Sequence, residues 1–201
     1  MDSFEKKYGR IPSDSLVFDE NVVALRLKTE RGYTDDLIEG CKVRLLEYTD
    51  CRYCAVRVPV CIKDNRVSMG YITTESASLA KNLASSRECY ILAVTLGQKV
   101  DYLLNKLSVI SAAEYYVTDA LASSLAETVA DMAEELIAGG RPVHTRFSPG
   151  YADLDLGIQK DVLEITDAYK LLGITLTKNY LMTPRKTVTA IAGIIDQQTE
   201  V

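Results

Sequence analysis

The segment Arg146-Phe-Ser-Pro-Gly-Tyr151 combines residue types that could hold a small anionic ligand. Pro149 and Gly150 favour a tight turn, because proline fixes φ and glycine tolerates positive φ. Glycine also lets a ligand approach the backbone closely, because it has no Cβ. Arg146 offers a planar guanidinium that matches a carboxylate, and Tyr151 offers a flat amphipathic ring. The segment alone therefore indicates either a carboxylate-binding loop or a structural turn with an exposed arginine.

Several other chemistries lack the residues that they need. His144 is the single histidine of the chain, so a Ser-His-Asp triad or a two-histidine zinc site would have to use it. The motif Cys51-Arg-Tyr-Cys54 has no second cysteine pair and leads into an alternating segment, which favours two strand cysteines over a redox or metal site. The phosphate-binding patterns G-x-G-x-x-G after a strand and G-x-x-x-x-G-K-[ST] are both absent.

Composition narrows the class of protein further. The chain has 201 residues, of which 47% are hydrophobic and 25% charged, as in ordinary globular proteins. Its 23 Lys and Arg against 28 Asp and Glu give a net charge of −5, which speaks against a nucleic-acid partner. No apolar run reaches the ~20 residues of a membrane helix, and the N-terminus lacks an export signal. We therefore expect a cytoplasmic protein with reduced cysteines, no nucleic acid and no membrane.

Alternating and apolar segments predict strands that arrive in hairpin-like groups. Pro59, within the longest alternating segment, predicts that this strand lies at a sheet edge or carries a bulge. The predicted strands cover residues 16–18, 22–27, 54–62, 67–72, 89–96, 174–182 and 187–195.

Helical periodicity is strongest over residues 112–137, where Ser111 and Glu114 form a capping box and Gly139 marks the end. Further helices are predicted after Thr34, over 76–84 with Thr74 as a cap, and over 158–172 before Gly173. Because strands and helices do not alternate as βαβ units, the predicted fold is α+β, a largely antiparallel sheet flanked by helices in a single domain spanning 1–201.

Three segments in order along the chain resemble the activation domain of cobalamin-dependent methionine synthase. Residues 146–159 resemble the R-x-x-P-G-Y signature of that S-adenosylmethionine-binding domain. Leu121-Ala-Ser-Ser-Leu-Ala-Glu127 is similar to its acidic helix, and Leu181-Met-Thr-Pro-Arg-Lys-Thr-Val-Thr-Ala190 is similar to its M-x-P-x-x-[ST]-V-[ST] segment. The resemblance is strongest over 89–193.

The resemblance implies a role for each matched residue. Arg146 would hold the methionine carboxylate and Glu127 the α-ammonium group. Backbone groups of Ser148 and Gly150 would line the ligand, and Tyr151 would face the corrin as the residue nearest the chemistry. Independently of the resemblance, the neighbours of Glu127 at helical spacing are small or acidic, which leaves room for a cationic ligand or describes a solvated helix face. They are Ala120, Ser123, Ser124, Ala130 and Asp131.

The resemblance also implies a function that depends on partners. The cobalamin-binding pattern D-x-H-x-x-G is absent, so a partner would carry the cobalamin. We expect a free-standing activation subunit that binds S-adenosylmethionine and supports reductive remethylation of cob(II)alamin on a methionine synthase core or another corrinoid protein. An electron donor such as flavodoxin would supply the electron. The alternatives are a non-catalytic corrinoid-protein adaptor, an S-adenosylmethionine sensor, or an unrelated ligand-binding domain with the same fold.

Overall fold

The computed structural model describes residues 4–27 and 34–195. Its centre is a curled six-stranded sheet in the order β4-β3-β2-β5-β8, with β1 also paired to β2. The paired strands of this sheet are all antiparallel, so the predicted α+β class with a largely antiparallel sheet is confirmed. The strands are β1 Lys6–Arg10, β2 Arg52–Lys63, β3 Arg66–Met69, β4 Ile72–Glu75, β5 Glu88–Thr95 and β8 Thr187–Gly193.

Strand β2 has different neighbours along its two halves. Its first half pairs with β1 as far as Val56, and its second half pairs with β3 from Val60. Pro59 lies between these two pairings, and β5 runs along the other side of β2. The prediction that Pro59 marks a sheet edge or bulge is therefore wrong for the strand, which is interior. Proline is tolerated here because its missing N–H faces the gap between β1 and β3.

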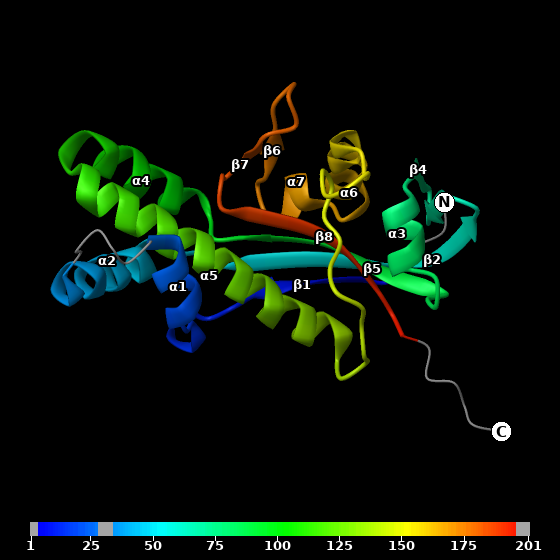
Figure 1. Ribbon diagram of the computed structural model, residues 1–201, viewed down its shortest axis with the longest axis horizontal. Helices are drawn as coiled ribbons and strands as arrows, with labels where there is room; N and C mark the ends of the chain where they lie inside the picture. The colour runs from blue at the N-terminus through cyan, green and yellow to red at the C-terminus, as the bar shows by residue number, and fades with distance from the viewer. Residues whose placement is uncertain (1–3, 28–33, 196–201) are drawn as a thin grey trace.

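Four helices cover one face of the sheet (Figure 1). The longest, α5 (Ala112–Ala138), lies diagonally across the strands, and α1 (Glu20–Leu27), α2 (Asp35–Tyr48) and α4 (Gln98–Ile110) pack around its N-terminal half. Leu92 and Val94 of β5 point into this core. The main apolar core of the molecule thus lies between α5 and the sheet.

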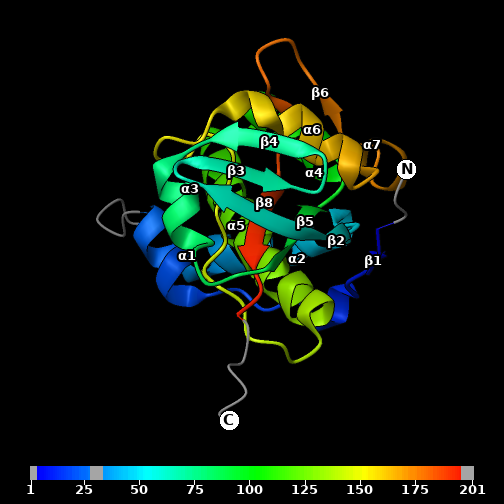
Figure 2. The same ribbon diagram turned by 90° about the vertical axis from the view of Figure 1, so that its right-hand side faces the viewer.

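Shorter elements cover the opposite face, as the turned view in Figure 2 shows. They are α3 (Ala77–Asn82), the 3-10 turn η3 (Leu156–Ile158), α6 (Gln159–Ile165), α7 (Ala168–Leu171) and a small hairpin of β6 (Thr175–Leu176) and β7 (Met182–Thr183). Ile91 and Ala93 of β5 pack on this side. Burial on both faces explains why β5 is a continuous apolar run rather than an alternating one.

The predicted N-caps of α5 and α2 and the glycine stop of α5 are confirmed, but the capping box is incomplete, because the Ser111 amide donates to the Leu107 carbonyl and the Glu114 carboxylate pairs with Arg44. The Ser111 Oγ accepts a hydrogen bond from the Glu114 amide at 3.3 Å, and α5 ends at Gly139 with a φ of 58°. The Thr34 hydroxyl accepts from the Leu37 amide at 3.3 Å at the start of α2. These contacts satisfy amides that a helix leaves unpaired at its first turn, and the left-handed glycine allows the chain to turn away.

Two N-terminal strand predictions are wrong. Residues 16–18 form no strand, and residues 22–27 belong to helix α1, where Val23 and Leu27 are buried four residues apart. The alternation of valine and leucine there also fits one helical face, and packing against α5 decides the outcome. Helix α4 is absent from the predicted helices, although Val100 and Leu107 lie on its buried face. Gly97, which precedes α4, has no side chain to signal a cap.

The C-terminal predictions also need correction. The helix predicted over 158–172 is interrupted at Asp167, whose φ is 57°, so α6 and α7 are separate. Residues 174–182 form the short β6–β7 hairpin instead of one long strand, since Tyr180 turns the chain with a φ of 60°.

Two predictions in the middle of the chain are also wrong. The cap of α3 is the Ser76 hydroxyl rather than Thr74. The predicted strand 67–72 is two strands, because Gly70 turns the chain between β3 and β4.

None of the helices in the described ranges is both long enough and apolar enough to cross a membrane.

Candidate functional site

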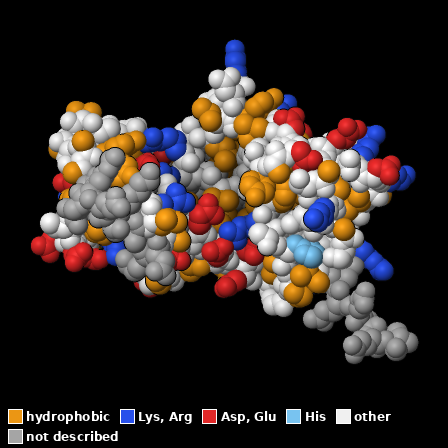
Figure 3. Space-filling model, viewed as in Figure 1, with side chains coloured by type: hydrophobic (Ala, Val, Ile, Leu, Met, Phe, Trp, Pro, Cys, Tyr) orange, Lys and Arg blue, Asp and Glu red, His pale blue; other side chains and the backbone are white. Residues whose placement is uncertain are grey.

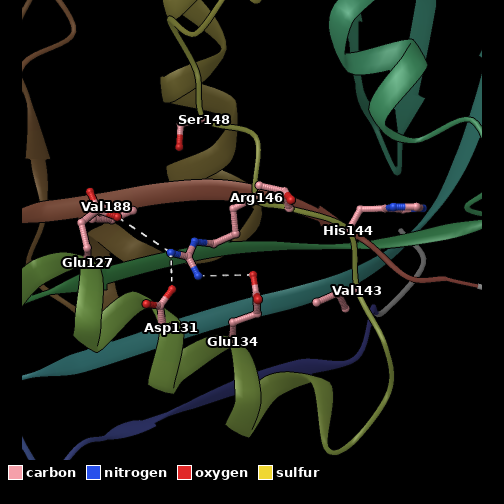
Figure 4. Close-up of a pocket in the computed structure, with 9 residues that line it drawn as sticks. Glu127, Asp131, Glu134, Val143, His144, Arg146, Ser148 and Val188 are labelled. Carbon is pink, nitrogen blue, oxygen red and sulfur yellow. Dashed lines mark hydrogen bonds and ion pairs between the residues drawn. The ribbon is translucent and has the colours of Figure 1, made fainter. Parts of the chain in front are cut away.

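The segment from 143 to 151 is held against the last strand of the sheet. The Phe147 amide donates to the Ile191 carbonyl and the Ile191 amide donates to the Phe147 carbonyl, both at 2.9 Å. The His144 amide donates to the Gly193 carbonyl at 2.8 Å. Phe147 is buried on the α6 side of the sheet. Arg146, the preceding residue, points to the opposite side, toward α5 (Figure 4).

Arg146 meets three carboxylates of α5. Glu127, Asp131 and Glu134 are spaced by four and three residues, so they lie on one face of the helix. The Nη2 atom of Arg146 lies 2.7 Å from the Asp131 Oδ1 and 3.8 Å from the Glu127 Oε2. Its Nη1 lies 3.4 Å from the Glu134 Oε2. The guanidinium thus joins the loop to the long helix (Figure 4).

These side chains line a cavity of about 440 Å³, which lies in the size range of small-molecule sites. Figure 3 shows acidic and basic side chains gathered in a hollow near the middle of this face. The lining residues are Glu127, Asp131, Glu134, Val143, His144, Thr145, Arg146, Ser148 and Val188.

Glu134 is the most enclosed of the three carboxylates. Its side chain is 22% exposed, against 55% for Glu127 and 66% for Asp131. Burial raises the pKa of Glu134, and the Arg146 guanidinium opposes that rise. The cavity is therefore lined by one half-buried carboxylate and two more exposed ones.

The Pro149-Gly150 turn is built by the chain's own hydrogen bonds. Gly150 has a φ of 83°, and its amide donates to the Leu154 carbonyl at 3.0 Å. The Tyr151 amide donates to the Ser148 carbonyl at 3.1 Å. The Tyr151 ring meets the Phe147 ring edge-on, with centroids 5.3 Å apart, yet Tyr151 remains 66% exposed. The turn thus presents an aromatic ring to solvent, three residues along the loop from the cavity-lining Ser148.

No family model and no curated protein matches this chain. Among solved structures, the chain is similar to the crystal structure of the MetH reactivation domain bound to AdoHcy, with a TM-score of 0.71 at 13% identity. The similarity covers 98% of this chain and 81% of that chain. The chain has the reactivation-domain fold. The sequence resemblance to the activation domain of cobalamin-dependent methionine synthase is thereby confirmed at the level of the fold.

Within this reactivation-domain fold, three of the expected site residues come together. Glu127, Arg146 and Ser148 line the same cavity, although they lie on a helix and a distant loop. Gly150 and Tyr151 are not among the residues that line it, and the Gly150 amide is already paired inside the turn. The ligand roles of all five residues remain predictions.

The third motif segment connects the reactivation-domain sheet to α5. The Lys186 Nζ lies 2.8 Å from the Asp119 carboxylate and donates to the Ser123 hydroxyl at 2.7 Å. Val188, two residues later on β8, lines the cavity. The segment therefore fixes the strand against the helix whose next turns carry the acidic side chains.

Sequence reasoning did not assign Asp131 or Glu134 to the site. The available signal was their spacing from Glu127, since residues four and seven positions along a helix share a face. His144 lines the cavity but its ring points away from Arg146 (Figure 4), and its Nε2 lies 2.8 Å from the Ser85 hydroxyl.

Two observations on the described residues concern metal and thiol chemistry. No group of three or more His, Cys, Asp or Glu there is arranged to hold a metal ion. Cys51 and Cys54 are free and buried, and burial raises the pKa of each to about 12. The thiolate, which is the reactive form, is therefore disfavoured at both positions.

Proposed function

We propose that this chain binds S-adenosylmethionine in the cavity around Arg146 and supports reductive remethylation of cob(II)alamin on a partner methionine synthase or another corrinoid protein. The observation that carries the proposal is the convergence of the motif residues Glu127, Arg146 and Ser148 on one cavity of a reactivation-domain fold. The similar structure holds AdoHcy, the demethylated product of S-adenosylmethionine.

The chemistry of the cavity fits the ligand. S-adenosylmethionine carries a carboxylate, an ammonium group and a sulfonium centre. Arg146 supplies a guanidinium for the carboxylate, and the carboxylates of Glu127 and Asp131 suit the cationic groups. The Ser148 side chain adds a hydroxyl group that can donate or accept a hydrogen bond. The volume of about 440 Å³ suits a ligand of this size.

The contribution of this chain would be to position the ligand. S-adenosylmethionine, when bound, supplies a methyl group activated by the adjacent sulfonium. Overall, one electron and one methyl group would pass to cob(II)alamin, and S-adenosylhomocysteine would remain. Arg146 and Glu127 would hold the amino-acid end, so that the methyl group is presented in one orientation instead of many. The partner would bring the corrin, and an external donor such as flavodoxin would bring the electron.

The exposed ring of Tyr151 supports the proposal that the partner's corrin approaches this chain at the loop. Tyr151 lies three residues after the cavity-lining Ser148, on a turn whose shape is fixed by the Gly150 and Tyr151 amides. A flat aromatic ring can cover a planar macrocycle without demanding a specific hydrogen bond. The turn would therefore be the point at which the partner's corrin approaches.

Calorimetry with S-adenosylmethionine tests the binding step. Binding of the wild-type chain in the micromolar range supports the proposal, and absence of binding at millimolar ligand overturns it. The second step is tested by mixing the chain with a cob(II)alamin-loaded methionine synthase core, a low-potential reductant and S-adenosylmethionine. A faster rise of the methylcobalamin spectrum with the chain than without it supports the activation role. Ligand binding without that acceleration would favour the adaptor or sensor alternative.

A further inference from the structure

We infer that Asp131 and Glu134 are specificity-determining residues that make the cavity prefer the positively charged S-adenosylmethionine over neutral S-adenosylhomocysteine. The inference rests on the proposed function, since it concerns the ligand preference of the same cavity. The inference starts from two ion pairs that the family motif does not include. Besides Glu127, the Arg146 guanidinium also pairs with the carboxylates of Asp131 and Glu134.

The cavity has an excess of negative charge. A site that only held an amino-acid end would need one cation and one anion, such as Arg146 and Glu127. Here Asp131 and Glu134 add two further carboxylates within 3.4 Å of the guanidinium. When all four groups are ionised, the excess is two negative charges. A ligand with a net positive charge compensates that excess better than a neutral one.

The difference between the two ligands lies in a single charge. Both carry a carboxylate and an ammonium group, which cancel. The sulfonium of S-adenosylmethionine adds one positive charge, whereas the thioether of S-adenosylhomocysteine adds none. Only this extra charge responds to the excess carboxylates, so they change the ratio of the two affinities rather than both equally.

The arrangement also indicates which groups move. Asp131 holds Arg146 at 2.7 Å, but its side chain is 66% exposed and can turn to water at small cost. Glu134 is only 22% exposed and stays within the cavity. An incoming carboxylate would therefore replace Asp131 on the guanidinium. The charge of Glu134, and that of Asp131 once it is released from the guanidinium, would then be free to attract the cationic part of the ligand.

The test is the ratio of two dissociation constants. Affinities for S-adenosylmethionine and S-adenosylhomocysteine are measured by calorimetry for wild type, Asp131→Asn, Glu134→Gln and the double variant. Each substitution should lower the preference for S-adenosylmethionine by about threefold to tenfold, and the double variant should lower it most. Glu135→Gln is the matched control, because it removes the same charge from the next residue of α5, which does not line the cavity.

The outcomes separate the two proposals. A preference that falls in the cavity variants and not in Glu135→Gln supports the inference. A wild type that binds both ligands with a preference unchanged by the double variant overturns the inference and leaves the proposed function standing. A wild type that binds neither ligand overturns both. Far-ultraviolet circular dichroism and thermal melting of each variant establish that the compared proteins are folded.

Discussion

The Asp153 carboxylate accepts a hydrogen bond from the Ser76 hydroxyl at 2.6 Å and thereby fastens the motif loop to the start of α3. The same carboxylate accepts from the Ala77 amide at 2.7 Å and from the Ser78 amide at 3.2 Å. Asp153 follows the exposed Tyr151 by two residues, so the turn that carries Tyr151 is anchored at both ends. Its first anchor is the pairing of the loop with β8, and its second is this cap.

The Asp153 contacts predict an acid-sensitive part of the stability. Its hydrogen bonds, first of all that from Ser76, lower the pKa of Asp153 to about 2 from an ordinary value of 3.8. Because the folded-state pKa lies below the unfolded one, the stabilisation is complete above about pH 4 and is lost as the pH falls through 2. Urea unfolding from pH 7 to pH 2 should therefore show Asp153→Asn destabilised at neutral pH and approaching wild type at low pH.

A surface aspartate gives the control for this measurement. Asp14→Asn changes an exposed side chain in the 3-10 turn Ser13–Ser15, far along the chain from the loop. It should not reproduce the pH-dependent gap between variant and wild type. A gap for Asp153→Asn that stays constant from neutral to acid pH would contradict the assignment.

A buried pair joins α6 to β8 and yields a second stability prediction. The Gln159 Nε2 donates to the Thr189 Oγ1 at 2.7 Å, and the Thr189 hydroxyl donates to the Gln159 Oε1 at 3.0 Å. Both residues are buried. Thr189→Val keeps the shape of the side chain but leaves the Gln159 carbonyl unpaired, which typically costs about 1–3 kcal/mol. Urea denaturation should show this loss in the free energy of unfolding.

The double variant distinguishes lost pairing from lost packing. Gln159→Leu with Thr189→Val removes both polar partners, so no buried group is left unsatisfied. It should be destabilised by less than the sum of the single variants. Additive losses would show that the pair is not coupled.

Elements with strong local signals could be predicted, and elements decided by packing could not. The cap at Ser111 and the left-handed Gly139 marked α5 correctly, because both act within one turn of the chain. The sequence of helix α1 predicts a strand, because Val23 and Leu27 are buried on one helical face only through packing against α5. The helix breaks at Asp167, whose backbone is left-handed. An aspartate in the sequence is only a weak indication of that conformation.

The candidate site was predictable as a set of residues but not as a set of contacts. The motif pointed to Arg146 and Glu127, and both line the cavity. The competition of Asp131 and Glu134 for the guanidinium depends on how β8 places the loop over α5, which is a tertiary relationship. The engaged amide of Gly150 likewise depends on the carbonyl of Leu154, four residues further along the loop.

Arg146 should dominate the affinity for S-adenosylmethionine. Arg146→Ala removes a charge-assisted contact to a carboxylate, a loss of about 1.5–3 kcal/mol or roughly 10–150-fold in affinity. Arg146→Lys should recover only part of this, because an ammonium group lacks the planar fork. Calorimetric titration with S-adenosylmethionine measures the affinity of both variants.

The control for Arg146 comes from the same loop. Arg141→Ala removes an arginine that bonds to the Tyr90 hydroxyl at 3.3 Å and does not line the cavity. It should bind S-adenosylmethionine like wild type. Because Arg146→Ala also leaves three carboxylates without their partner, its melting temperature is compared with that of wild type. Equal affinity for wild type and a folded Arg146→Ala would refute the role of Arg146.

Tyr151 should matter to the partner more than to the ligand. Its ring is 66% exposed and does not line the cavity, so Tyr151→Ala should leave the affinity for S-adenosylmethionine within a few-fold of wild type. The same variant should slow the remethylation of cob(II)alamin on a methionine synthase core, because it removes the flat surface that would meet the corrin. Tyr151→Phe should keep most of the rate, since the ring rather than the hydroxyl makes this contact.

The competing explanation is that Tyr151 only stabilises the loop through its edge-on contact with Phe147. In that case Tyr151→Ala would lower the melting temperature and leave the remethylation rate per folded molecule unchanged. Tyr8→Ala, which removes another exposed ring on β1, is the matched control and should change neither the rate nor the affinity. The decisive assay follows the cobalamin spectrum at saturating S-adenosylmethionine, because saturation removes any small difference in affinity. A slower rate for folded Tyr151→Ala under that condition assigns the ring to the encounter with the corrin.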